Sequence, residues 1–284
     1  MSTDQSSVIQ TAKKYYDSHD AYIFYTTVWG GEEHHLGIYR TPEDSLFQAS
    51  RRIIDRMASY SSQLQELGNK ARLLDLGSGY GGTARHLAKT FGCQVVGLNL
   101  SETENIRHRE KNQEQGLDKL IEVVDGNFER IPYEENSFDV VWSQDSFLHS
   151  PDREQVIKEA TRVLKPGGEF IFTDPMQTED AYPEYLDPIL KRIHLASLAT
   201  PSFYFQTAEK MGLKLKKFEN LQVQLANHYA KVLEDTIALE DQLREKEVSQ
   251  EYLDHMKKGL KHWSDGGQYG HLTWGIFCFQ KPGK

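Results

Sequence analysis

The 284-residue chain has little cysteine, no long apolar run and no excess of basic side chains. Its two cysteines, Cys93 and Cys278, are too few for a disulfide framework and lack the paired spacing of a zinc site. No stretch approaches the roughly 18 consecutive apolar residues of a membrane-spanning helix. The first ten residues, MSTDQSSVIQ, lack the basic flank followed by an apolar run that is typical of a secretory signal peptide. The 33 lysines and arginines against 42 acids give a net charge of −9, which offers nucleic acid no net attraction. These absences predict a cytoplasmic protein with neither a membrane nor a nucleic-acid partner.

The composition is globular, with 38% hydrophobic and 11% aromatic residues. Residues 1–68 are expected to form an N-terminal helical cover, with one helix over 45–67 that Gly68 caps. Residues 69–175 alternate short apolar runs with glycine-bearing turns and helices. The elements expected in the last stretch, 176–284, are a helix over 182–198, a helix over 202–212, a strand over 213–223, a charge-rich helical region over 227–262 and a final strand over 271–282.

The alternation in the middle stretch predicts an α/β fold. Five strands joined by crossover helices imply a Rossmann-like, doubly wound and mostly parallel sheet, with ligands at the carboxyl ends of the strands. The helix that begins at Arg153 is expected to stop at Lys165, because Pro166 disfavours its continuation. The final strand is expected to lie antiparallel beside the fifth, which makes seven strands in one domain over residues 1–284, with a C-terminal helical insertion.

A glycine-rich loop follows the first apolar run. Gly77, Gly79 and Gly82 have the G-x-G-x-x-G spacing, which lets the backbone turn sharply and approach a nucleotide. A tight turn without a ligand and the pyrophosphate loop of a nicotinamide oxidoreductase are the alternatives. Asp75 argues against the second, because its carboxylate would repel a pyrophosphate, whereas it suits the α-ammonium group of a methionine-derived cofactor. Position 99 is also asparagine where a dinucleotide fold usually has an acid.

The sequence DLGSGYGG, the polar residues at the next two strand ends and the LKPGGEF segment together resemble the class I S-adenosylmethionine-dependent methyltransferases. The resemblance covers about residues 70–175. It implies S-adenosylmethionine as cofactor, with Asn99 at the ribose, Asp125 at the adenine amino group and Gln144 under the methionine part. The residues that it implies for cofactor binding are Asp75, Gly77, Gly79, Asn99, Leu100, Asp125, Asn127, Phe128 and Gln144. Taken singly, Asp125 could cap a turn and Asn99 could be an ordinary strand-end side chain.

A narrower resemblance begins upstream, in residues 15–44. The runs FY, VWGGE and HHLGIY within this segment are most similar to the sarcosine/dimethylglycine N-methyltransferases, which make glycine betaine. The resemblance implies a small amine acceptor, sarcosine or dimethylglycine. Methylation of a sugar or phenolic hydroxyl by the same scaffold is the alternative within enzymes, and a non-catalytic nucleotide-binding module is the alternative outside them.

Methylation of a tertiary amine creates a permanent cation, so its pocket should offer aromatic faces. A desolvated quaternary ammonium gains up to about 2 kcal/mol from a cation–π contact. The candidates for acceptor binding are Tyr25, Trp29, Tyr204 and Trp274. The plainer interpretation of each ring is core or lid packing.

The acceptor amine must also lose a proton before it attacks. His149 follows the fourth predicted strand and, with an unperturbed pKa of about 6.5, is the candidate general base. It could instead cap the next helix, and a neutral amine selected from solution needs no base. The partner of the acceptor carboxylate is left open among Arg40, Arg192, His271 and backbone amides. No metal is expected, because no set of side chains has metal-ligand spacing, and the chain is expected to be a monomer or a homodimer.

Overall fold

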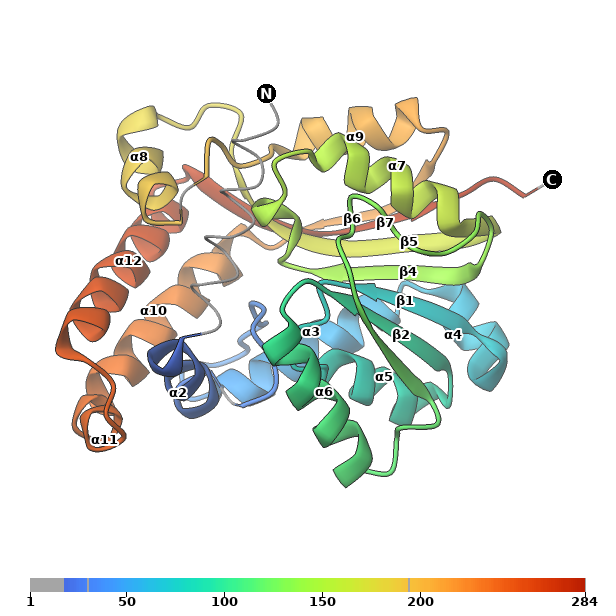
Figure 1. Cartoon of the computed structure of the whole chain (residues 1–284). Coiled ribbons are helices and arrows are strands. Elements are labelled where there is room, and N and C mark those ends of the chain that lie inside the picture. The colour runs from blue at the N-terminus through green and yellow to red at the C-terminus, as the bar shows by residue number, and fades with distance from the viewer. Residues whose placement is uncertain (1–17, 30, 194, 284) are drawn as a thin grey trace. The chain divides into compact units, whose positions relative to one another are not determined.

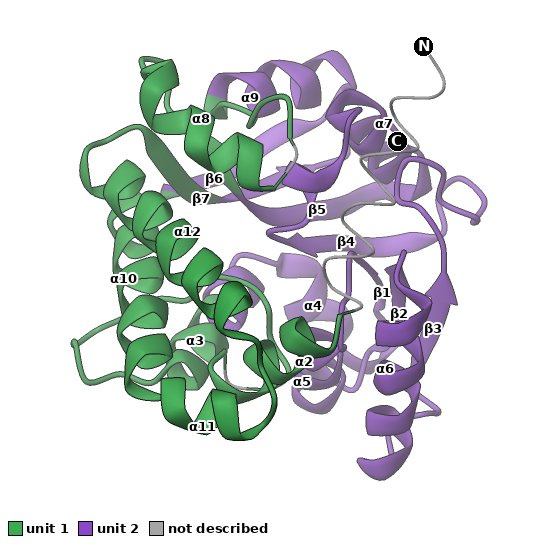
Figure 2. Ribbon diagram, turned by 60° about the vertical axis from the view of Figure 1, so that its left-hand side comes forward, with its two compact units in different colours: residues 1–53, 175–201, 220–275 green, residues 54–174, 202–219, 276–284 purple. Residues whose placement is uncertain are grey.

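The computed structural model describes residues 18–29, 31–193 and 195–283. The part of the predicted helical cover in residues 1–17 therefore lies outside the described residues. The chain divides into two compact units, each built from three separate segments (Figure 2). Unit 1 comprises 1–53, 175–201 and 220–275, and unit 2 comprises 54–174, 202–219 and 276–284. Each unit thus combines segments that lie far apart in the sequence.

A seven-stranded sheet has the order β3-β2-β1-β4-β5-β7-β6 (Figure 1). The strands are β1 (Arg72–Leu76), β2 (Gln94–Asn99), β3 (Ile121–Asp125), β4 (Phe138–Gln144), β5 (Leu164–Gln177), β6 (Lys214–Asn220) and β7 (Leu272–Gln280). The pairs formed by β1 to β5 are parallel. Gly167 hydrogen-bonds with Lys281 and Thr178 with His271, so β7 runs antiparallel to β5. The predicted Rossmann-like, mostly parallel sheet and the place of its last strand are confirmed.

Helices cover both faces of this sheet in unit 2. Figure 1 shows α7 and α9 on the face opposite to α5. The helices around the sheet are α4 (Ser62–Leu67), α5 (Gly82–Phe91), α6 (Glu102–Glu114), α7 (Arg153–Val163) and α9 (Pro201–Lys210). Ser101 caps α6 and Asp152 caps α7, each accepting a hydrogen bond from a backbone N–H of the first turn. The central strands β1 and β4 are buried on both faces, as crossover helices require.

Unit 1 is mainly helical. Its helices are α2 (His19–Thr27), most of α3 (Leu46–Ala58), α8 (Pro183–Arg192), α10 (Gln222–Ala238), α11 (Glu240–Glu245) and α12 (Gln250–Gln268). The long helices α10 and α12 pack against each other, with the rings of Tyr229 and Trp263 stacked 4.9 Å apart. Gly267 lets them approach closely, since a Cβ there would lie 2.8 Å from Leu225. Among the described residues, no helix is both long and apolar enough to cross a membrane.

Several predicted helices are shorter than expected or divided. The helix over 45–67 breaks between α3 and α4, because Ser61 leaves the helical conformation and caps the second helix through Leu64 N–H. The region 227–262 divides into α10, α11 and α12, with Glu247 at a φ of 65° and Ser249 capping α12. In place of 182–198, α8 ends at Arg192.

The helix expected to reach Lys165 ends earlier. α7 stops at Val163, and Leu164 already has extended backbone angles. Lys165 and Pro166 belong to the start of β5. A proline is tolerated there because the first residues of a strand need not donate to the ladder.

A buried carboxylate connects three elements of unit 2. The Glu169 side chain in β5 is fully buried and accepts hydrogen bonds from the hydroxyls of Ser61 and Ser62 at 2.6 Å. The carboxylate also accepts hydrogen bonds from two backbone N–H groups at the start of α4. It forms an ion pair with Lys216 Nζ of β6 at 2.5 Å. Burial alone would raise the pKa of this carboxyl, but the hydrogen bonds from Lys216, Ser61 and Ser62 outweigh it and hold the pKa below its ordinary value.

We expect Glu169→Gln to lower the free energy of unfolding by about 2–4 kcal/mol at pH 7, because five donors lose their charged acceptor. The lowered pKa means that the carboxylate stabilises the fold at neutral pH and that this stabilisation is lost as the pH falls. Urea unfolding at pH 7 and pH 4 measures both effects. The difference in unfolding free energy between the wild type and Glu169→Gln should be smaller at pH 4 than at pH 7. A difference that is equally large at both pH values would contradict this account.

Candidate functional site

Polar side chains lie at or near the carboxyl ends of four neighbouring strands of unit 2. Strand pairing places Asn99 opposite Asp125, Asp75 opposite Gly97 and Leu76 opposite Ser143, next to Gln144. Asp125, Asn99, Asp75 and Gln144 therefore follow one another across β3, β2, β1 and β4, at or near their carboxyl ends. We call these four residues the cofactor edge. A ligand in a doubly wound sheet binds at this edge.

The glycine-rich loop lies beside the cofactor edge. Gly77 has a φ of 75°, and its N–H donates to Leu98 O at 2.8 Å. A Cβ at Gly77 would lie 2.5 Å from the Ser146 side chain, so the close approach requires glycine. At Gly81, with a φ of 78°, a Cβ would lie 2.0 Å from the ring of His108. The loop thus turns into α5 against α6, in a conformation that excludes a Cβ at both glycines.

Unpaired polar atoms at the cofactor edge have the chemistry that the expected cofactor requires. Asp75 is buried, and its Oδ2 has no hydrogen-bond partner among the described residues. Desolvation raises the pKa of its carboxyl to about 7. Gln144 Oε1 accepts from Thr83 Oγ1 at 2.9 Å and from Trp142 Nε1 at 3.1 Å, which leaves its buried amide NH₂ unpaired in the same part of the chain.

An unpaired carboxylate and an unpaired amide donor suit the two ends of an α-amino acid. The carboxylate of Asp75 can accept from an ammonium group, and the NH₂ of Gln144 can donate to a carboxylate. The methionine part of S-adenosylmethionine carries both groups. A pyrophosphate carries only acceptors, so it would meet Asp75 with like charge. The residues present therefore fit S-adenosylmethionine better than a dinucleotide.

The outer half of the cofactor edge is tied to α6. Asn99 Nδ2 donates to Glu104 at 2.9 Å, and Asn105 Nδ2 donates to Asp125 Oδ1 at 2.8 Å. The half-exposed Asp125 also pairs with Arg109 at 2.7 Å. Burial would raise the pKa of Asp125, but these two neighbours lower it below its ordinary value. Asp125 is thus ionised at neutral pH, and its adenine contact stays a prediction.

The other predicted cofactor residues lie along the same edge. Leu100 directly follows β2 and is 37% exposed. Asn127 accepts from Glu129 N–H through its Oδ1, which closes the turn after β3. The Phe128 ring lies 3.9 Å from where a Cβ of Gly77 would stand. An apolar side chain and a ring beside the glycine loop are consistent with an adenine site, and each contact stays a prediction.

The turn after β4 holds His149, the predicted general base, in the 3-10 helix Phe147–His149. Asp145 opens this turn with a φ of 52°, and Thr173 Oγ1 donates to it at 2.8 Å. Burial and the charge of Arg153 lower the pKa of His149 to about 4. The fold thus moves the pKa of His149 well below its unperturbed value of about 6.5, and its role as general base stays a prediction. A side chain this weakly basic does not hold a proton at neutral pH.

An aromatic–histidine cluster lies in unit 1 and comprises Tyr25, Trp29, His34, His35, Tyr39 and His228. The rings of Tyr25 and Trp29 lie 5.2 Å apart, and those of Tyr25 and His34 lie 4.6 Å apart. Desolvation lowers the pKa of His34 and His228 to about 3 and that of His35 to about 4. The imidazoles are therefore neutral, and the cluster offers rings without a positive charge of its own.

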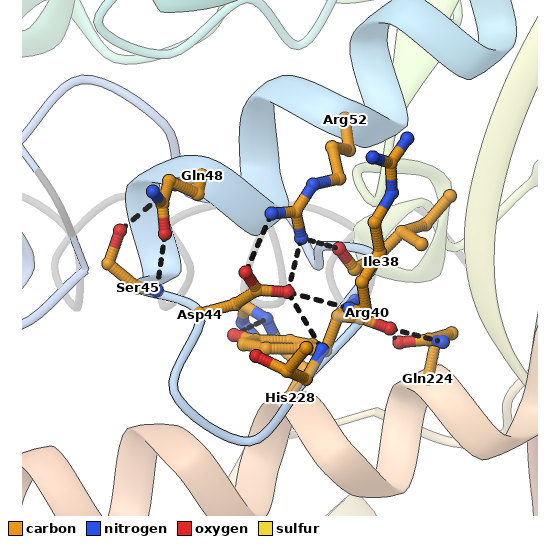
Figure 3. A network of polar contacts seen from close by, with 10 residues as sticks. Ile38, Arg40, Asp44, Ser45, Gln48, Arg52, Gln224 and His228 are labelled. Atoms are coloured by element: carbon orange, nitrogen blue, oxygen red, sulfur yellow. Dashed lines mark hydrogen bonds and ion pairs between the residues drawn. The ribbon is translucent and has the colours of Figure 1, made fainter.

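Two side chains of α10 hold the segment that carries this cluster. Gln224 accepts from Tyr39 N–H at 2.8 Å and donates to Tyr39 O at 3.1 Å, as a neighbouring strand would. His228 accepts from Gly37 N–H at 3.2 Å. Figure 3 shows the next contact along the segment, where Asp44 accepts from Arg52 of α3 and from backbone N–H groups. The HHLGIY run is thus fixed between α3 and α10.

Tyr204 and Trp274, the other predicted acceptor contacts, have no exposed surface. The Tyr204 hydroxyl donates to Asp174 Oδ2 at 2.7 Å, and Asp174 Oδ1 accepts from Leu148 N–H at 3.0 Å. Tyr204 therefore supports the turn before His149 from within the core of unit 2. Trp274 lies in β7, where its carbonyl accepts from Leu221 N–H. Acceptor contact by either ring stays a prediction.

The three side chains that were considered as partners of the acceptor carboxylate have different surroundings. Arg40 is exposed, and its backbone N–H is bound by Asp44. Arg192 is half-buried beside Gly259 of α12. His271 is buried and stacks on Tyr185 at 4.0 Å. None of these side chains belongs to the aromatic–histidine cluster.

Sequence reasoning missed Gln224, His228, His108 and Asp174. His228 shares the buried face of α10 with Leu225 and Val232, which helical spacing could have indicated. His108 lies in the middle of α6, a polar helix with no distinct apolar face, so hydrophobic periodicity gives no signal there. In the part of the chain that the structure describes, no group of three or more histidine, cysteine or acidic side chains could hold a metal ion.

Comparison with known proteins places this architecture among methyltransferases. The family described as "Methyltransferase domain" matches residues 74–172. A sarcosine/dimethylglycine N-methyltransferase of Halorhodospira halochloris is 53% identical over 96% of both chains, and one of Aphanothece halophytica is 48% identical over 99% of this chain and 100% of its own length. A crystal structure described as that of a sarcosine dimethylglycine methyltransferase of Galdieria sulphuraria superposes with a TM-score of 0.86 at 40% identity, covering 91% of this chain and 97% of that chain.

Proposed function

The chain belongs to the sarcosine/dimethylglycine N-methyltransferase family, and we propose that it transfers methyl groups from S-adenosylmethionine to the nitrogen of sarcosine and dimethylglycine, yielding glycine betaine. The observation that carries the proposal is the 53% identity with a sarcosine/dimethylglycine N-methyltransferase over 96% of both chains. The unpaired Asp75 carboxylate and Gln144 amide at the cofactor edge support the choice of cofactor.

When bound, S-adenosylmethionine would supply an electrophilic methyl group, to which the lone pair of the acceptor nitrogen would bond as the bond between methyl and sulfur breaks and S-adenosylhomocysteine leaves. Asp75 would accept from the α-ammonium group of the cofactor, and Gln144 would donate to its carboxylate. In the proposed arrangement Asn99 would contact the ribose and Asp125 the adenine. Most of the rate then comes from holding the two reactants in line, for which positioned groups rather than a strong base are needed.

The acceptor nitrogen becomes cationic during the transfer. Tyr25 and Trp29 offer aromatic faces to a cation, and each such contact contributes up to about 2 kcal/mol when water is excluded. The neutral imidazoles of His34 and His35 beside them add no repulsive charge. A cluster of this kind suits an amine better than the phenolate that a hydroxyl acceptor must become.

The chain is also proposed to work in a reducing compartment such as the cytoplasm. Cys93 and Cys278 are both buried free thiols. Burial raises their pKa values, to about 11 and about 12, so neither thiol ionises at neutral pH. The two cysteines therefore act as small core side chains.

We expect the rate to follow the ionisation of the acceptor amine. His149 stays neutral above pH 5, so log(kcat/KM) for dimethylglycine at saturating cofactor should rise by about one unit per pH unit up to the pKa of the amine. His149→Gln should leave the shape of this profile unchanged. A wild-type inflection near pH 6–7 that disappears in His149→Gln would instead make His149 the base.

An acceptor panel tests the proposed function. Labelled S-adenosylmethionine is incubated with the enzyme and, separately, with sarcosine, dimethylglycine, a catechol and a sugar. We expect label in the two amines and none in the hydroxyl compounds. Turnover confined to catechol or sugar would overturn the proposal in favour of an O-methyltransferase.

A further inference from the structure

His228 of α10 is held in one neutral tautomer by two neighbours that hydrogen-bond to its ring. Its ring is fully buried. Gly37 N–H lies 3.2 Å and the Tyr39 hydroxyl 3.0 Å from Nδ1. A backbone N–H can only donate, so Nδ1 accepts and carries no proton. The ring is neutral, because burial keeps its pKa far below neutrality, and its one proton therefore lies on Nε2.

This Nε2–H group is buried and finds no acceptor in the described part of the chain. Buried donors in folded proteins are almost always paired, and an unpaired one weakens the fold. The ring that holds it is nevertheless anchored on its other side by two hydrogen bonds. An anchored ring with a fixed, unpaired donor is the arrangement of a group that binds something else.

The surroundings of His228 indicate the class of that ligand. The Trp29 ring lies 5.2 Å from the imidazole, and the Tyr25 ring lies 5.2 Å from that of Trp29. A second histidine near the ring, His35, is also neutral, and the Tyr229 ring lies 5.8 Å from the imidazole. A donor beside aromatic faces is complementary to a small molecule with an acceptor oxygen at one end and a cationic nitrogen at the other. Sarcosine and dimethylglycine have these two ends.

We propose that His228 Nε2–H binds the carboxylate of the amine acceptor and so selects amino acids over simple amines. The inference rests on the proposed function, whose acceptors carry this carboxylate. The two donors on Nδ1 withdraw electron density from the ring and so strengthen the Nε2–H donor. Arg40, Arg192 and His271 are not needed for this contact.

The two nitrogens of His228 can be separated by substitution. In His228→Asn the amide oxygen can stand near the position of Nδ1 and accept from Gly37 and Tyr39, but nothing reaches the position of Nε2. In His228→Gln the longer side chain brings its NH₂ near the position of Nε2 and loses the acceptor at Nδ1. The first variant therefore removes the proposed contact, and the second removes the anchor while keeping a donor.

The test compares dimethylglycine with its amide, N,N-dimethylglycinamide, which lacks the carboxylate. We expect His228→Asn to lower kcat/KM for dimethylglycine about 10- to 100-fold, mainly through KM, since a hydrogen bond to a charged group is lost. Turnover of the amide and the Kd of S-adenosylmethionine should change by less than about threefold, within the usual effect of a distant substitution. His228→Gln should keep most of the preference of the wild type for the acid.

The possible outcomes distinguish a failure of the His228 inference from a failure of the proposed function. An equal loss on the acid and the amide, or no loss on either, would make His228 a structural residue and overturn the inference while the proposed function stands. A wild-type enzyme that methylates neither dimethylglycine nor sarcosine would overturn both. If His228→Asn does not fold, a His228→Gln variant that loses the preference for the acid also overturns the inference.

Discussion

Asp75→Asn should weaken S-adenosylmethionine binding by about 100-fold or more and, at the same time, stabilise the cofactor-free protein. Removing one partner of a buried charge pair costs about 3–5 kcal/mol, and 1.4 kcal/mol corresponds to a factor of ten in Kd. Without the cofactor, the same carboxylate is buried and its Oδ2 is unpaired among the described residues. Calorimetric titration measures the first effect, and thermal unfolding measures the second.

The pH dependence gives the Asp75 prediction its sharpest form. The pKa of Asp75 is raised to about 7 in the folded protein, against about 3.9 for an unfolded chain. The folded state therefore holds this proton more tightly, and the carboxyl costs stability as the pH rises from about 4 to about 7. The gain in unfolding free energy of Asp75→Asn over the wild type should grow over that interval. A gain that is constant with pH, or a loss at pH 8, would contradict the account.

Gly81→Ala should also weaken cofactor binding strongly, for a steric reason. The Cβ would stand 2.0 Å from the ring of His108, which fills the space beneath the loop. We expect a loss of at least about 100-fold in affinity for S-adenosylmethionine, because such a clash displaces the loop that carries the binding backbone. The double variant Gly81→Ala/His108→Ala should recover at least part of the affinity, since the second change restores the space.

Gly212→Ala is the matched control for Gly81→Ala. Its φ of 79° equals that of Gly81 within a degree, but nothing in the described chain lies within 4 Å of its Cβ position. It therefore carries the same backbone strain, about 1 kcal/mol, without the clash. If Gly81→Ala binds the cofactor as tightly as Gly212→Ala does, His108 does not shape the loop.

The parts of the fold that could be predicted are those that neighbouring residues specify. An apolar run followed by a glycine-rich turn is local, so β1, its loop and the order of Asp75, Asn99, Asp125 and Gln144 along the sheet were accessible from the sequence. The break before α4 was also local, because Ser61 offers a cap, but an unbroken apolar period concealed it.

The rest depended on contacts between distant segments. His228 binds a backbone N–H 191 positions away, and no pattern within α10 reveals that partner. The pKa of His149 follows from burial and from Arg153, so its weak basicity could not be read from its position after β4. Tyr204 was selected as an aromatic face for the acceptor, and its complete burial by the packing around Asp174 could not be read from its position in the sequence.

The most direct test of the central claim is the identity of the methylated atom. The enzyme is incubated with dimethylglycine and S-adenosylmethionine carrying a ¹³C methyl group, and the product is followed by NMR. The account predicts one labelled N-methyl group per glycine betaine formed, with an equal amount of S-adenosylhomocysteine. Label on oxygen, or cofactor that binds with no transfer to either sarcosine or dimethylglycine, would contradict it.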